Sequence, residues 1–141
     1  MRFMVLVKAN KDSEAGVLPS EQELVEMGKF NEELIKSGIM LAGEGLHASS
    51  KGARLRFGAD GKATVIDGPF TETKELLAGF WMVQAKSKEE VIELFKRCPP
   101  GVGELEIRQV FDAADFEPSI KTDAGRAVME MEEKFRKEHG T

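Results

Sequence analysis

The chain has 141 residues, of which 32% are charged and 41% are hydrophobic, and its formal net charge at pH 7 is −5. This length and composition are typical of one globular domain that buries a core, and they exclude a disordered chain. The negative charge disfavours attraction to the phosphate backbone, so neither DNA nor RNA is an expected partner.

The chain contains one cysteine, Cys98, and two histidines. One cysteine forms no internal disulfide, and this residue set is too small for a structural zinc site, so we expect no bound metal. The start, Met1 to Lys8, has too short an apolar run for a signal peptide, and no run approaches the roughly 20 residues needed to span a bilayer. We therefore expect a cytoplasmic protein without a membrane partner.

The hydrophobic pattern predicts the order strand, helix, strand, hairpin, strand, helix, strand, helix. The predicted bounds are 2–9, 21–36, 39–42, 53–57 with 63–66, 77–85, 87–98, 104–111 and 124–135. Ser20 with Glu23, and Ser87 with Glu90, have the spacing of capping boxes that begin the first two helices. We expect loops between these elements, a glycine-punctuated loop or bulge at 43–47 and a linker at 112–123. Cys98 lies on the apolar side of the second helix, where packing is its expected role.

Without the hairpin and the last helix, the order is βαββαβ, which is that of a ferredoxin-like α+β fold. The predicted organisation is one domain at 1–111, followed by the linker and C-terminal helix at 112–141. Strands 2–9 and 77–85 are apolar on both alternating sets, but two helices cover only one face of the sheet. We expect a second copy to cover the other face about a twofold axis, giving a homodimer. Docking of the C-terminal helix on that face is the alternative.

A polar, turn-forming stretch connects the hairpin to the strand at 77–85. Pro69 fixes its own φ and restricts Gly68, so the backbone is stiff there. The five residues after Phe70 include two acids, two threonines and a lysine, which is more than a plain connection requires. Loops held by a rigid scaffold often carry binding and catalytic groups. A tight corner with solvated charges is the other interpretation.

The sequence Asp67-Gly68-Pro69-Phe70-Thr71-Glu72-Thr73-Lys74-Glu75, with Gly43-Glu44-Gly45-Leu46 before it and Leu76-Leu77-Ala78-Gly79-Phe80 after it, resembles the DGPF branch of the YCII-related family. The resemblance covers about residues 2–110. It implies a dimeric α+β barrel of the muconolactone isomerase type with a pocket near the motif. It also implies a suspected enzymatic activity without a settled reaction and, for some members, association with extracytoplasmic-function sigma factors.

The better-studied YCII branch carries a His/Asp pair thought to be catalytic. Asp67 matches the aspartate, but the helix at 21–36, where the histidine is expected, contains none. His47 lies elsewhere, at a position where the DGPF branch often has glutamine. This departure weakens the transfer of the dyad mechanism.

The candidate catalytic residues are Asp67, Glu44 and His47. Asp67 and Glu44 end strands that the fold can place side by side, and two carboxylates near apolar groups can serve as a base and an acid. The alternative is that Glu44 caps its glycine turn and Asp67 holds the Gly-Pro corner. His47 is a candidate proton shuttle or a surface histidine. The candidate substrate-binding residues are Gly68, Pro69, Phe70, Glu72, Lys74 and Arg54.

Two functional hypotheses follow. The first is a homodimer that binds a small carbonyl compound or acid near the DGPF stretch, with proton-transfer or hydrolytic chemistry that needs neither metal nor cofactor. The second is a noncatalytic partner that regulates a sigma factor. The Gly-x-Gly-x-x-Ala pattern at 43–48 leads into a strand, whereas a dinucleotide fingerprint opens a helix, so we expect no dinucleotide cofactor.

Overall fold

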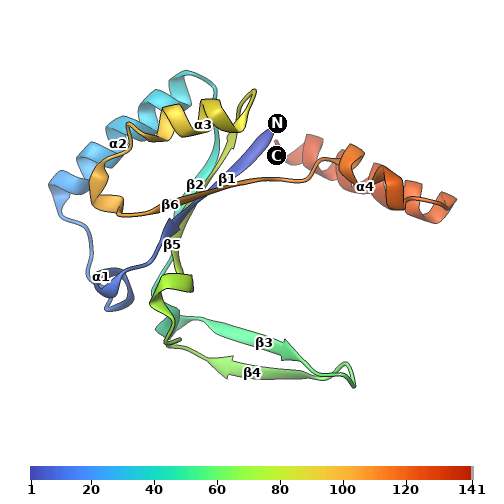
Figure 1. The fold of residues 1–141 in the computed structure, drawn as a ribbon, viewed down its shortest axis with the longest axis horizontal. Coiled ribbons are helices and arrows are strands. Elements are labelled where there is room, and N and C mark those ends of the chain that lie inside the picture. Colours follow the sequence, from blue (N-terminus) through green and yellow to red (C-terminus); the bar gives the residue numbers. More distant parts are fainter. Residues whose placement is uncertain (141) are drawn as a thin grey trace.

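A four-stranded antiparallel sheet forms the centre of the fold (Figure 1). The computed structural model describes residues 1–140. The strands are β1 (Arg2–Lys8), β2 (Met40–Gly45), β5 (Leu77–Gln84) and β6 (Leu105–Gln109), arranged in the order β2-β5-β1-β6. Each neighbouring pair is antiparallel. This order confirms the ferredoxin-like βαββαβ arrangement predicted from the sequence.

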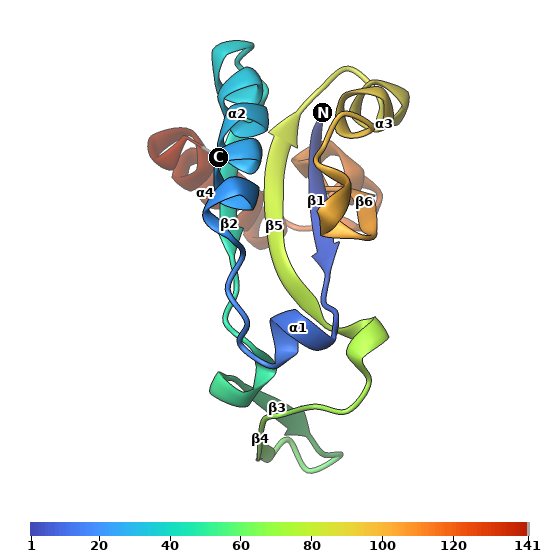
Figure 2. The same ribbon diagram turned by 90° about the vertical axis from the view of Figure 1, so that its left-hand side faces the viewer.

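Helices α2 (Glu21–Lys36) and α3 (Lys88–Phe95) cover one face of this sheet (Figure 2). The capping box of α2 is confirmed: the Ser20 hydroxyl accepts from the Glu23 amide at 3.1 Å, and the Glu23 carboxylate accepts from the Ser20 amide at 3.4 Å. At α3 only half of the predicted box forms. The Ser87 hydroxyl accepts from the Glu90 amide, but the Glu90 carboxylate accepts from the Lys86 amide one residue earlier.

The core lies between the sheet and these helices. Phe30, Trp81 and Phe95 meet edge to face, with ring centroids 5.1 to 6.1 Å apart. Such aromatic contacts add to the hydrophobic free energy of burial. Cys98 is buried beside this cluster, and burial raises the pKa of its thiol to about 11. The thiol therefore stays protonated at neutral pH, consistent with the predicted packing role.

The other face of the sheet is not covered by a helix. Met4 and Leu6 of β1 and Phe80 and Met82 of β5 alternate with buried residues and are only half-buried. The C-terminal helix α4 (Asp123–His139) lies on this side but stands away from the strands (Figures 1 and 2). Within one chain, the prediction that β1 and β5 are buried on both faces therefore holds for one face only.

Strands β3 (Ala53–Phe57) and β4 (Ala63–Asp67) form the predicted hairpin as a separate two-stranded sheet. The hairpin projects from one end of the main sheet, and α4 extends from the other end. Both lie on the side of the uncovered sheet face (Figure 1). One of its faces is apolar and open to solvent, because Leu55, Phe57 and Val65 are 60%, 69% and 62% exposed. An isolated hairpin is marginally stable, so the contacts at its base matter.

Several predicted loops contain short helices. These are α1 (Lys11–Glu14) and the 3₁₀ helices η1 (Ser49–Lys51), η2 (Thr73–Glu75), η3 (Pro100–Val102) and η4 (Ala113–Ser119). The glycine-punctuated segment at 43–47 is partly strand, since β2 continues to Gly45. None of the helices within residues 1–140 has the length and apolar composition to span a membrane.

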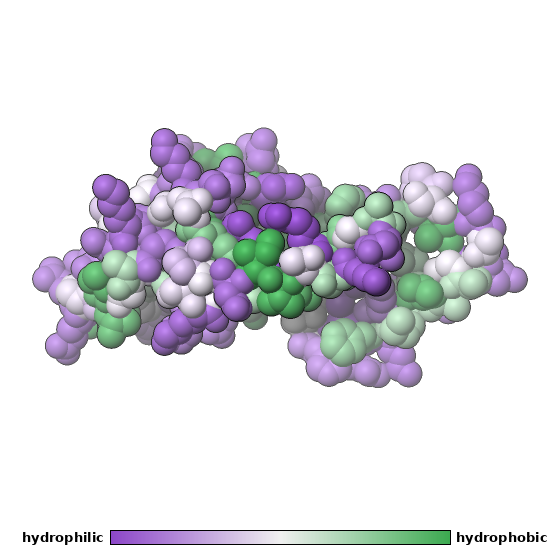
Figure 3. Space-filling model, turned by 90° about the horizontal axis from the view of Figure 1, so that it is seen from below, coloured by the Kyte–Doolittle hydropathy of each residue, from purple (hydrophilic) through white to green (hydrophobic). Residues whose placement is uncertain are grey.

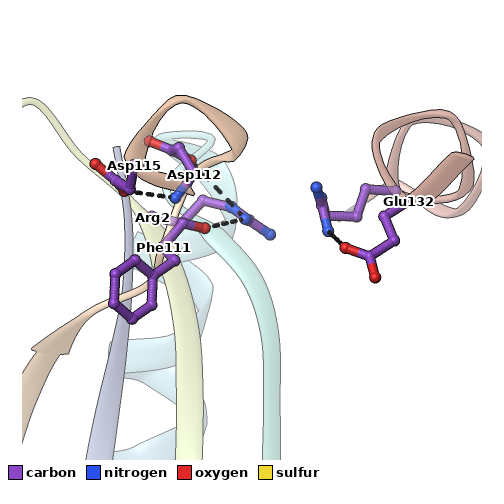
Figure 4. A network of polar contacts seen from close by, with 6 residues as sticks. Arg2, Phe111, Asp112, Asp115 and Glu132 are labelled. Atoms are coloured by element: carbon purple, nitrogen blue, oxygen red, sulfur yellow. Dashed lines mark hydrogen bonds and ion pairs between the residues drawn. The ribbon is translucent and has the colours of Figure 1, made fainter. Parts of the chain in front are cut away.

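The predicted linker after β6 is ordered by local polar contacts (Figure 4). The Asp115 carboxylate accepts from the Asp112 amide at 2.7 Å, which begins η4. Arg2 donates to the carbonyl oxygen of Phe111 at 3.1 Å and lies 3.8 Å from the Asp112 carboxylate. Glu132 of α4 takes no part in this network. The chain is thus fixed to β1 as far as η4, whereas α4 extends beyond it.

Candidate functional site

A cavity of about 700 Å³ lies between the first half of α2 and the sheet. Its apolar wall includes Val7 of β1, Leu24 and Met27 of α2, and Trp81 of β5. The segment between α1 and α2, including Val17 and Leu18, lines it from another side. Small-molecule sites commonly have this volume and a mostly apolar lining.

Trp81 and Asn31 supply a polar pair in this wall. The indole N–H of Trp81 donates to the amide oxygen of Asn31 at 2.8 Å. The side-chain amide nitrogen of Asn31 makes no hydrogen bond within residues 1–140, so it remains a donor in the cavity lining. The structure therefore offers one oriented donor beside a large aromatic surface.

Two glycines of β2 leave space beside Trp81 because they have no side chains. A Cβ on Gly43 would lie 3.0 Å from the Trp81 ring, which places this glycine on the helix-covered face. Gly45 is two residues further along the strand and so is on the same face, and a Cβ there would meet no atom within 4 Å. A side chain at position 45 would therefore enter the cavity.

The candidate catalytic residues are separated by the fold. His47 and Glu44 both line the cavity. Glu44 pairs with Phe80, however, so strand alternation directs its carboxylate to the uncovered face and leaves its backbone at the cavity. Asp67 is exposed at the end of β4 and is not part of the lining. The structure thus brings His47 to the cavity but does not bring the Asp67 and Glu44 carboxylates together there.

The DGPF residues form the base of the hairpin. The Gly68 amide donates to the carbonyl oxygen of Gly52 at 3.0 Å, and the Phe70 amide donates to the Ser49 hydroxyl at 3.0 Å. The peptide bond between Gly68 and Pro69 is cis. A Cβ on Gly68 would lie 1.7 Å from the Ser49 carbonyl oxygen, so only glycine fits. The motif therefore joins β4 to the turn that precedes β3.

The other candidate substrate-binding residues contact the hairpin or solvent. The Arg54 guanidinium carbon lies 3.8 Å from the centre of the Phe70 ring, a cation–π contact. Glu72 and Lys74 are exposed, and within residues 1–140 neither forms an ion pair. Gly68, Pro69, Phe70, Glu72, Lys74 and Arg54 all lie outside the cavity lining.

Ser49 joins three segments that are distant in the sequence. Both its amide and its hydroxyl donate to the Glu14 carboxylate, while its hydroxyl accepts from Phe70. These hydrogen bonds from Ser49 hold the pKa of Glu14 below its usual value. Because His47 and Ala48 come directly before Ser49 and line the cavity, the Ser49 contacts fix the position of that wall.

Replacing Glu14 with glutamine is expected to lower the free energy of unfolding by about 1–2 kcal/mol at pH 7, because charged hydrogen bonds are lost at a partly exposed site. Because folding lowers the pKa of Glu14, its carboxylate stabilises the folded protein above about pH 4.5. This stabilisation is lost as the pH falls through the folded-state pKa. Urea unfolding at pH 7 and at pH 3 measures both effects. The difference from wild type should shrink at pH 3, and Glu72→Gln, at an exposed position without an ion pair, serves as the control.

Within residues 1–140, no group of three or more histidine, cysteine, aspartate or glutamate side chains is arranged to hold a metal ion.

Comparisons with known proteins identify relatives of this chain. The sequence model of the YCII-related domain matches residues 1–114. An uncharacterised protein of Rhizobium meliloti (strain 1021) is 29% identical over 91 residues, which are 62% of this chain and 73% of that protein.

One solved structure with similarity to this chain is 5-chloro-2-hydroxyhydroquinone dehydrochlorinase from Burkholderia phenoliruptrix AC1100, in complex with 2,5-dihydroxybenzoquinone. It has 17% sequence identity and a TM-score of 0.45, with 79% of this chain and 94% of that chain covered. At this level of similarity, neither its reaction nor its ligand is transferred to the present protein.

Proposed function

The chain belongs to the YCII-related domain family, and on this premise we propose that it binds a small organic molecule in the cavity between α2 and the sheet. The observation that carries the proposal is the cavity itself, with a volume of about 700 Å³ and a lining that combines Trp81, Met27 and the Asn31 amide. An apolar pocket with few oriented polar groups is the usual form of a small-molecule site.

The ligand class that fits this lining is a compact carbonyl compound with an apolar body. The indole of Trp81 and the side chain of Met27 offer apolar contact, and the free amide nitrogen of Asn31 can donate to a carbonyl oxygen. His47, an exposed residue of the lining, is the group we propose for proton transfer.

In this proposal the DGPF residues have a structural role. Gly68 bonds to Gly52 and Phe70 bonds to Ser49, so both fix the base of the hairpin. Ser49 in turn positions the wall that contains His47. Asp67 and Glu44 are assigned no proton transfer, because their carboxylates have no place in the cavity.

We also propose that the functional unit is a homodimer joined through the uncovered face of the sheet. Support comes from Met4, Leu6, Phe80 and Met82, which a single chain leaves half-buried on that face. Pairing two such faces would remove this apolar surface from water. The cavity lies on the opposite, helix-covered face, so the dimer would leave it accessible.

Thermal shift and fluorescence titration with a panel of small carbonyl compounds test the proposed function. Trp81 is the only tryptophan, so its emission reports directly on the cavity wall. A ligand is expected to change this emission saturably in wild type and to bind at least about tenfold more weakly to Asn31→Ala. It is expected to lose binding in Gly45→Leu, which places a side chain in the cavity. Ligands that bind Gly45→Leu as tightly as wild type would overturn the assignment.

A further inference from the structure

Helix α4 carries an apolar stripe that its own chain leaves open. Val128, Met131 and Phe135 are 45%, 59% and 56% exposed, and Ala124 is exposed on the same line. Figure 3 shows hydrophobic patches in the right-hand part of the molecule, where the hairpin and α4 lie. Helix α4 lies outside residues 1–114, the part matched by the family model, so the stripe is a feature of this chain beyond that domain.

The spacing of the α4 stripe is that of a helix–helix contact. Ala124, Val128, Met131 and Phe135 are separated by four, three and four residues, which is the alternation of the two core positions of a heptad. In an antiparallel pair of such helices centred between Val128 and Met131, Val128 of one copy faces Met131 of the other. Ala124 then faces Phe135, so a small side chain lies opposite a large one at each end.

The charges of α4 disfavour a parallel arrangement. Residues 123–133 contain four acids and one base, whereas residues 134–139 contain three bases and one acid. Ion pairs within the helix, such as Glu133 with Lys137 at 3.4 Å, are largely exposed and contribute little. A parallel pair would bring like-charged segments together, whereas in the antiparallel register Asp123 lies level with Arg136 of the second copy, and Arg126 with Glu133.

We propose that α4 pairs antiparallel with α4 of a second copy of this chain, through the α4 stripe. Complementarity of side-chain size about the midpoint of the stripe is what a twofold contact between identical chains requires. The inference rests on the proposed homodimer, because α4 stands on the side of the uncovered sheet face (Figures 1 and 2). The helix pair extends that interface and adds stability to it.

Two full-length triple variants with the same number of serines test the pairing. Val128→Ser/Met131→Ser/Phe135→Ser removes the stripe, and Glu130→Ser/Glu133→Ser/Lys137→Ser changes the opposite side of α4 at no smaller cost in helix propensity. Sedimentation equilibrium is expected to show a dimer dissociation constant at least about 100-fold higher for the stripe variant and within about threefold of wild type for the control. Far-UV circular dichroism reports whether α4 stays helical.

A second measurement does not depend on weakening the dimer. In Val128→Cys/Met131→Cys, mild oxidation is expected to link two chains, because the two positions face each other across the pair; Cys98 is buried. If wild type is a dimer but the stripe variant dimerises equally well, or no linked dimer forms, the α4 pairing is wrong and the sheet-face dimer stands. If wild type is a monomer at micromolar concentration, both fail, while ligand binding in the cavity remains testable by itself.

Discussion

Replacing Gly68 with alanine is expected to lower the free energy of unfolding by about 3 kcal/mol, because the new methyl group has no space to occupy. The added Cβ would lie 1.7 Å from the carbonyl oxygen and 2.5 Å from the carbonyl carbon of Ser49. These are backbone atoms of a segment that Glu14 and Phe70 hold in place, so a side-chain rotation cannot relieve the overlap. Urea unfolding measures the loss, and hydrogen exchange is expected to accelerate first in residues 49–52 and 66–70.

Gly28→Ala is the matched control for this change. Gly28 lies within α2, where a Cβ would meet no atom within 4 Å, so alanine there is expected to stabilise the protein by up to about 1 kcal/mol. The two variants add the same methyl group and should therefore shift stability in opposite directions. A Gly68→Ala protein with wild-type stability would show that the DGPF corner is not the fixed contact described here.

Replacing Trp81 with alanine is expected to cost about 3–5 kcal/mol, because it removes the largest side chain of the core. Trp81 is 5% exposed, contacts the rings of Phe30 and Phe95, and donates to Asn31 at 2.8 Å. Trp81→Phe keeps an aromatic ring and loses the hydrogen bond, so its cost should be smaller. Thermal unfolding followed by circular dichroism measures both.

Leu18→Ala is the control for this truncation, since Leu18 is 84% exposed and its loss should change stability by less than about 0.5 kcal/mol. If Trp81→Ala were no more destabilising than Leu18→Ala, the aromatic cluster would not be the centre of the core. Trp81→Ala would also enlarge the cavity, so any ligand that contacts the indole should bind more weakly to this variant.

Much of the fold could be predicted because its signals are local. Ser20 and Glu23 determine the start of α2 through contacts three residues apart, and Asp60-Gly61 determines the hairpin turn. Apolar residues on both alternating sets of positions in β1 and β5 identified the two central strands. The prediction was incomplete for the second face of the main sheet, which is only half-buried within one chain. An apolar pattern indicates which residues need to be covered, but it does not indicate which chain covers them.

The candidate site was predicted less well because it depends on contacts between distant residues. Ser49 contacts Glu14 and Phe70, which are 35 and 21 residues away, and no spacing rule connects them. Asn31 was missed because a polar residue on a helix is usually solvent-exposed, whereas here Trp81 orients it. The DGPF stretch packs against Ser49 at the base of the hairpin, a contact that the sequence does not indicate, and its polar side chains lie outside the cavity.

The most direct test of the central claim is chemical-shift mapping of the full-length protein with a compound that binds it. If the ligand occupies the cavity, the largest shifts are expected at the Trp81 indole, the Asn31 side-chain amide, and the backbone amides of Gly43, Gly45 and His47. Shifts concentrated instead in residues 67–75, with the Trp81 indole unchanged, would contradict the account and return the binding site to the DGPF stretch.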